Sequence, residues 1–85
     1  MTPTLTEIAD VVRANVHPDH LRDLKVHPCG MITYTMDEMY RYFCSVVIRD
    51  GKILDMSRLS PDGDALEQTF DDLDAYARFF ISEEV

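Results

Sequence analysis

The feature that most constrains the fold of this chain is an Asp-Gly pair between two runs of strand-forming residues. Asp50-Gly51 separates residues 40–48 from residues 53–59. A type I′ turn needs a positive φ at both central residues, and Asp-Gly adopts these angles at little steric cost. The sequence therefore predicts a β-hairpin about Asp50-Gly51, in which Val46 lies opposite Asp55.

A third strand is predicted before this hairpin, over residues 31–36, which are rich in strand-forming side chains. A tight connection at Asp37-Glu38 would place Tyr34 opposite Arg41. With that register, both faces of a three-stranded antiparallel sheet carry apolar side chains, whereas a sheet that is wet on one side alternates apolar and polar residues. We therefore expect helices to cover one face and a loop or a partner to cover the other.

Two amphipathic helices are predicted, one before and one after the strands. Thr4-Leu5-Thr6-Glu7 has the form of a capping box, and the helix that it starts should run over about residues 5–16. That helix should end before His17-Pro18, because the residue before a proline is disfavoured in the helical conformation. The second helix is expected to begin after a cap at Thr69 and to end near Ser82.

The remaining segments are less regular. Residues 18–24 are expected to form one or two helical turns, with Pro18 at the first position. Residues 65–68 have the pattern of either a fourth short strand or an extended lead-in to the last helix. The whole pattern predicts an α+β fold in a single domain over residues 1–85: a helix, a three-stranded antiparallel meander and a C-terminal helix.

Acidic residues are concentrated in the last third of the chain. The formal net charge is −8, and residues 55–85 carry nine acidic side chains against two basic ones, Arg58 and Arg78. A field of this sign repels nucleic acid and anionic membranes and attracts basic surfaces. The expected partner is therefore a basic protein, with no direct contact to nucleic acid or to a membrane.

The chain has no sequence signal for a membrane or for export. No stretch approaches the roughly 20 apolar residues of a transmembrane helix, and the first residues lack the basic start and apolar run of a secretion signal. Cys29 and Cys44 are too few for a disulfide framework. We expect a cytoplasmic protein.

The main functional hypothesis is a non-catalytic protein-interaction module without a cofactor. Clustered carboxylates imitate the spaced negative charges of a nucleic-acid backbone, so a module that carries them can inhibit a nucleic-acid-binding enzyme by occupying its nucleic-acid site. In size and charge, the chain is similar to small acidic proteins of viral origin that act in this way. The candidate contacts are six carboxylates and two aromatic anchors: Asp62, Asp64, Glu67, Asp71, Asp72, Asp74, Tyr40 and Tyr42.

Three alternatives remain open. The acidic residues can serve solubility alone. The apolar faces of the sheet can pair two copies into a homodimer that acts as a scaffold or holds a ligand. The third alternative is a small metal- or thiol-dependent enzyme built on His17, His20, His27 and Cys29. The spacing of these four residues matches no zinc-binding pattern, so no metal site and no catalytic residue is predicted.

Overall fold

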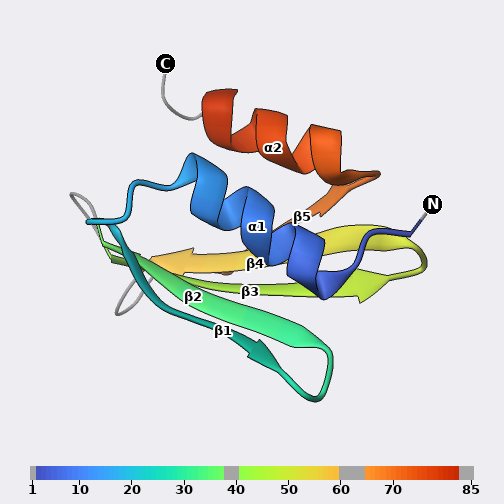
Figure 1. Ribbon diagram of the computed structural model, residues 1–85, viewed down its shortest axis with the longest axis horizontal. Coiled ribbons are helices and arrows are strands. Elements are labelled where there is room, and N and C mark those ends of the chain that lie inside the picture. The colour runs from blue at the N-terminus through green and yellow to red at the C-terminus, as the bar shows by residue number, and fades with distance from the viewer. Residues whose placement is uncertain (1, 38–40, 60–64, 83–85) are drawn as a thin grey trace.

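In the computed structural model, residues 2–37, 41–59 and 65–82 are described, and they form a five-stranded antiparallel sheet with two helices on one of its faces (Figure 1). The elements are α1 (Leu5–Asn15), β1 (Leu21–His27), β2 (Met31–Asp37), β3 (Arg41–Arg49), β4 (Lys52–Leu59), β5 (Ala65–Phe70) and α2 (Leu73–Ser82). The strands lie next to one another in the order of the chain. The predicted α+β class is confirmed, whereas the predicted number of three strands is wrong.

The β3–β4 hairpin has the register that the sequence predicts. Asp50 and Gly51 have φ angles of 53° and 76°, which are the positive values that a type I′ turn needs. Val46 pairs with Asp55 across the two strands. The prediction is confirmed, and this register fixes which side chains of β3 and β4 face α1 and α2.

The predicted register between β2 and β3 is wrong. Tyr34 pairs with Cys44 rather than with Arg41, because β2 ends at Asp37 and β3 begins only at Arg41. A shift by an odd number of residues moves every side chain of a strand to the other face of the sheet. Cys44 therefore faces the helices, and Phe43 faces away from them.

β1 occupies the segment for which helical turns are predicted. A turn is confined to Pro18–His20, and the strand begins directly afterwards at Leu21. Asp23 has a φ of 55°, and the pairing with β2 is irregular between Arg22 and Lys25. A bulge of this kind interrupts the alternation of apolar and polar residues, so the segment lacks the sequence pattern of a strand.

The sequence leaves open whether residues 65–68 are a strand or an extended lead-in to the last helix. In the structure they belong to a strand, β5, which pairs with β4. The pairing continues to Phe70, so Thr69 lies in the sheet opposite Leu54. Asp72 caps α2 instead, since its Oδ1 accepts a hydrogen bond from the backbone N–H of Ala75 at 2.8 Å. The predicted cap at Thr69 is wrong because the strand extends further than expected.

The core lies between the sheet and the pair α1 and α2. α1 begins with the predicted capping box, in which Thr4 Oγ1 accepts from Glu7 N at 3.1 Å and Glu7 Oε1 accepts from Thr4 N at 3.0 Å. The buried apolar residues come from α1 and the residue that follows it, and from β2, β3, β4 and α2. They are Ile8, Ala9, Val12, Val16, Ile32, Tyr34, Cys44, Val46, Ile53, Tyr76 and Phe80.

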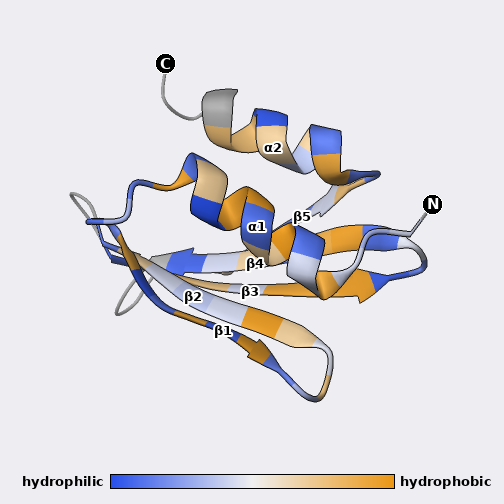
Figure 2. Cartoon of the chain, in the orientation of Figure 1, coloured by the Kyte–Doolittle hydropathy of each residue, from blue (hydrophilic) through white to orange (hydrophobic). Residues whose placement is uncertain are grey.

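The second face of the sheet is open. α1 and α2 lie side by side on the same face (Figure 1), and no described element covers the opposite one. Figure 2 shows hydrophobic and hydrophilic stretches along the strands, and the pleat directs successive side chains of each strand to opposite faces. The described part of the chain contains no helix whose length and apolar character would allow it to cross a membrane.

We expect Gly51→Ala to lower the free energy of unfolding by about 1–2 kcal/mol, because an alanine side chain is strained at a φ of 76°. A clash adds nothing to this cost, since a Cβ there would lie 3.7 Å from Thr2 Oγ1. Gly51→Asn is the matched control and should cost clearly less, because asparagine tolerates positive φ. Urea unfolding measures both, and equal losses would contradict the assigned turn.

Candidate functional site

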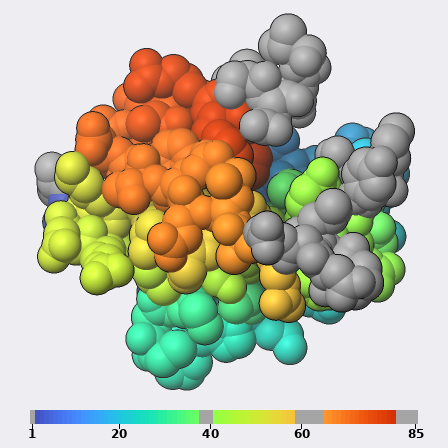
Figure 3. Space-filling view, turned by 180° about the vertical axis from the view of Figure 1, so that it is seen from behind, coloured from blue at the N-terminus to red at the C-terminus, as the bar shows by residue number. Residues whose placement is uncertain are grey.

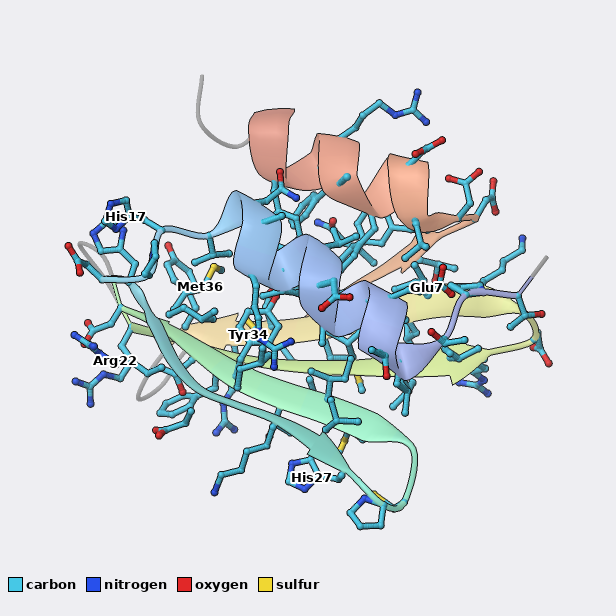
Figure 4. The ribbon with its side chains drawn as sticks, in the orientation of Figure 1. Glu7, His17, Arg22, His27, Tyr34 and Met36 are labelled. Atoms are coloured by element: carbon cyan, nitrogen blue, oxygen red, sulfur yellow. The ribbon has the colours of Figure 1, made fainter. Side chains whose placement is uncertain are left out.

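A cavity of about 300 Å³ opens between the sheet and the C-terminal parts of α1 and α2. Its floor is a row of cross-strand neighbours that all face the helices, one from each of β2 to β5: Tyr34, Cys44, Ser57 and Leu66. Asn15 at the end of α1 and Phe79 and Phe80 of α2 line the opposite side. The cavity thus exists because α1 ends where the sheet continues. In Figure 4, Tyr34 and Met36 mark the part of β2 that borders it.

A carboxyl group lies at the inner end of this cavity. Asp55 is only 6% exposed, because the β3–β4 register directs its side chain toward the helices. Tyr76 Oη donates a hydrogen bond to Asp55 Oδ2 at 2.7 Å, and Tyr34 Oη lies 3.3 Å from Tyr76 Oη. No basic side chain among the described residues forms an ion pair with Asp55. The three residues therefore form a buried chain of hydrogen bonds that ends on an unneutralised carboxyl.

The protonation of this chain follows from its burial. Burial raises the pKa of Asp55, and the hydrogen bond from Tyr76 opposes that rise to a smaller extent. Burial likewise raises the pKa of the Tyr34 and Tyr76 hydroxyls, and the charge of Asp55 contributes to both shifts. Tyr34 and Tyr76 therefore remain protonated and can donate hydrogen bonds throughout the physiological range.

Cys44 borders the same cavity but is a poor nucleophile. Burial raises the pKa of its thiol to about 12, and the charge of Asp55 adds to the shift. The thiolate is the reactive form of cysteine, so the population available for attack near neutral pH is very small. The cavity can hold a proton or a ligand on Asp55, and it offers no activated thiol.

Sequence reasoning did not select Asp55 as a site residue, although one signal was present. The correctly predicted hairpin register already places Asp55 opposite Val46, in the middle of the apolar run of β3. A carboxylate opposite a buried apolar residue on a central strand is rare, since carboxylates are almost never fully buried without a partner. Such a residue is a functional-site candidate on physical grounds.

The acidic residues proposed as contacts lie in several places. Glu67 is exposed on the open face of β5, while Asp71, Asp72 and Asp74 lie at the start of α2. Tyr42 lines the cavity, on the face of the sheet opposite to Glu67. Asp62, Asp64 and Tyr40 lie outside the described residues. The structure therefore gathers Asp71, Asp72 and Asp74, and it separates Tyr42 from them.

Two of the three grouped carboxylates also have structural roles. Asp71 Oδ1 lies 3.2 Å from Lys52 Nζ, and Asp72 caps α2. Asp72 and Asp74 border a shallow depression together with Glu7 of α1. The acidic surface at this end of the molecule is thus formed by the first turns of both helical segments.

The histidines and the cysteine considered for a metal or thiol centre lie in two separate places. The rings of His17 and His20 are 5.4 Å apart in the connection between α1 and β1. His27 is at the end of β1, where its Nε2 lies 2.7 Å from Thr33 Oγ1, and Cys29 is exposed in the following turn. Figure 4 shows His17 and His27 far apart. Within the described residues, no three His, Cys, Asp or Glu side chains are grouped to hold a metal ion.

The open face of the sheet is a second candidate site, because most of the basic residues point to it. All eight Lys and Arg residues are described, and the strand registers place six of them on this face: Arg22, Lys25, Arg41, Arg49, Lys52 and Arg58. Three acidic residues of the described strands lie at this face: Asp37 and Glu67 by their register, and Asp23 at the bulge of β1, which borders a depression together with Arg22 and Phe43. Seen from behind, β5 and α2 lie above β3 and β4, and the end of the β1–β2 hairpin projects below them (Figure 3).

The centre of this face is apolar. Phe43 is 44% exposed, and it lies in a row that runs from Arg22 through Thr35 and Phe43 to Arg58. Half-buried apolar side chains continue the patch along β2, β3 and β4: Met31, Val47, Leu54 and Met56. Arg41 pairs with Asp37 and Lys52 with Asp71, whereas the other four basic residues form no ion pair with any described residue. The open face is therefore an apolar patch with a basic rim.

Asp55→Asn should stabilise the protein at neutral pH. Burial holds the native pKa of Asp55 above its unfolded value, so the native state binds this proton more tightly. Protonated Asp55 therefore stabilises the native state at low pH. This contribution is lost as the pH rises from the pKa of Asp55 in the unfolded state through its pKa in the native state, at about 1.4 kcal/mol for each pH unit. Asparagine does not ionise, and its Oδ1 still accepts from Tyr76. We expect a gain in the free energy of unfolding that is largest near neutral pH and disappears at about pH 4, the ordinary pKa of an aspartate in an unfolded chain.

Urea unfolding at several pH values measures this effect. Glu67→Gln, on the exposed side of the neighbouring strand, is the matched control and should leave the pH dependence of stability close to that of the parent protein. A parallel pH dependence in Asp55→Asn and the parent protein would show that Asp55 is not destabilised by burial.

In comparisons with protein-family models, with curated proteins and with solved structures, no match was found.

Proposed function

We propose that this protein is a non-catalytic protein-interaction module whose contact surface is the open face of the sheet. The observation that carries this proposal is the position of six of the eight basic residues, all of them described, around an apolar centre on a face that no described element covers. Apolar patches with a polar rim are typical of protein contact surfaces. The partner that fits this surface is an acidic protein segment with an apolar or aromatic anchor.

The net charge of −8 does not oppose an acidic partner at this face. The shortest dimension of the molecule is 21 Å, whereas the Debye length at physiological ionic strength is about 8 Å. The carboxylates on α1 and α2 are therefore largely screened from a partner that approaches from the open side of the sheet. Within that distance lie Arg22, Lys25, Arg49 and Arg58, which form no ion pair with any described residue and give this face its positive local charge.

Phe43 supplies the central anchor. It is flanked on the open face by Arg58 on one side and, across Thr35, by Arg22 on the other. Neighbouring strands are about 4.8 Å apart, so the row from Arg22 to Arg58 spans roughly 15 Å. Interfaces concentrate their binding energy in such a centre, where an aromatic side chain is surrounded by residues that exclude water.

An acidic protein fits this face better than two other partners. A second copy, paired face to face as in the homodimer hypothesis, would bring two basic rims together. Single-stranded nucleic acid needs several exposed aromatic side chains for its bases, and the described part of this face offers Phe43 alone as a strongly exposed aromatic. The charge and the composition of the face thus favour an acidic polypeptide.

A basic protein at the acidic residues is the second candidate. Glu7, Asp72 and Asp74 border one depression at the start of both helical segments, which provides a local negative surface. A partner bound at this position would contact Asp72 and Asp74, which belong to the acidic last third of the chain. The engagement of Asp71 with Lys52, and of Asp72 with the backbone of α2, reduces what these residues offer to a partner.

The test uses two short labelled peptides that share their Phe and Leu positions and differ only in carrying Glu or Lys at the others. We expect fluorescence anisotropy to show binding of the Glu peptide, with an affinity that falls as salt is raised. Arg22→Glu combined with Arg58→Glu should weaken binding by about tenfold or more, because it reverses the charge on both sides of Phe43.

Arg13→Glu combined with Arg78→Glu is the matched control. It changes the net charge equally, but both residues are exposed on α1 and α2, so binding should be nearly unchanged. Stronger binding of the Lys peptide would favour the second candidate. Stronger binding of a single-stranded oligonucleotide, or an equal loss in both double variants, would refute an acidic partner at the open face.

A further inference from the structure

The cavity around Asp55 has the properties of a small-molecule site, which is independent of the protein contact proposed for the other face of the sheet. Its volume of about 300 Å³ is at the lower end of the range for ligand pockets and corresponds to about ten water-sized groups. The lining is mainly aromatic and apolar, with a few polar groups from Asn15, Ser57 and Gln68. Pockets of this composition bind small organic molecules and orient them through their few polar contacts.

Asp55 determines which charge the ligand carries. Among the described residues, the carboxylate accepts one hydrogen bond, from Tyr76 on Oδ2, although an ionised carboxyl can accept about four. A buried charge without a counter-charge is costly, and a cation placed beside it removes most of that cost. Among the described lining residues no Lys, Arg or His is present, so an anionic ligand would be repelled.

The groups around Asp55 leave it as the main titrating group of the cavity. The titratable side chains that interact electrostatically with it are Tyr34 from β2, Cys44 from β3 and Tyr76 from α2, and all three are neutral near physiological pH; Tyr42 of β3 also lines the cavity. β5 contributes Gln68 and α1 contributes Asn15, which do not titrate. No described element supplies a competing positive charge.

An organic cation fits better than a metal ion. Hard cations such as Ca²⁺ and Mg²⁺ need about six oxygen ligands with several carboxylates among them, and the described lining provides one carboxylate. The rings of Tyr34, Tyr42, Phe79 and Phe80 instead provide the aromatic surface on which an ammonium group and its apolar body are stabilised.

We infer that this cavity binds a small organic amine, whose ammonium group lies on Asp55 and whose apolar body contacts Phe79, Phe80 and Leu66. The ammonium donates to the carboxylate oxygens, while Tyr76 continues to donate to Asp55 Oδ2. The ligand thus supplies the positive charge that the described chain lacks at this position. Binding of the amine favours the ionised carboxyl and strengthens as the pH rises through the pKa of Asp55.

The experiment compares three probes of similar shape: phenethylamine, the neutral phenethyl alcohol and the anionic phenylacetate. Binding is followed by amide chemical shifts of the whole protein and by isothermal titration calorimetry. We expect phenethylamine to bind with shifts at the residues of the cavity, the alcohol to bind about tenfold more weakly or worse, and phenylacetate not to bind.

Asp55→Asn provides the decisive comparison, because asparagine keeps the volume and the hydrogen bond from Tyr76 and removes only the charge. In this variant the affinity for phenethylamine should fall to that for the alcohol and lose its pH dependence. Glu67→Gln, a carboxyl removed from the open face, should bind phenethylamine as the parent protein does.

Three results would overturn the inference: no binding of phenethylamine at millimolar concentration, equal binding of the amine and the alcohol, or undiminished amine binding by Asp55→Asn. The Arg22→Glu and Arg58→Glu double variant should bind phenethylamine normally, since both residues face away from the cavity. Failure of the peptide contact and failure of the amine site are therefore distinguishable.

Discussion

The pairing of Val46 with Asp55 is the constraint on which the rest of this structure depends. The turn at Asp50-Gly51 fixes that pairing, and the pleat then sends alternate side chains of β3 and β4 to opposite faces. Asp55 comes to lie among buried residues beneath α2, and Arg58 faces the other way. A slip by one residue would bury the basic residues and expose the core, so the register is strongly specified. One short turn thus places Asp55 in the cavity and Arg58 on the open face.

The sequence predicted the elements whose determinants are local. The Asp-Gly turn and the capping box at Thr4 each lie within a few neighbouring residues, and both are present in the structure. The elements that it missed depend on distant residues. The bulge at Asp23 removes the alternation by which β1 could be recognised, and Thr69 is identified as a strand residue only by its partner Leu54. Local propensity cannot supply such pairing information.

The candidate sites were harder to predict than the fold, because both arise from combining several strands. Net charge is a sum over the whole surface, and it says nothing about where the opposite charges gather. In this chain the excess of acidic residues drew attention to the last third, while six of the eight basic residues, all within the described segments, share one face. That grouping follows from the registers of β1 to β4, and of these the sequence predicted only the one between β3 and β4. Asp55 lies in the acidic last third of the sequence, but its pairing with Val46 places its side chain in the core.

The sheet therefore separates two chemical environments within a small protein. On one side lies a buried carboxyl that forms no ion pair with a described residue, and on the other a basic rim surrounds Phe43. The direct measurement of this separation is the titration of the Asp55 carboxyl carbon by NMR in the unliganded protein. We predict that the pKa of Asp55 lies above the ordinary range of an aspartate, which is centred at about 4. Titration of Asp55 within that ordinary range would mean that its side chain is solvated, and it would contradict the account at its centre.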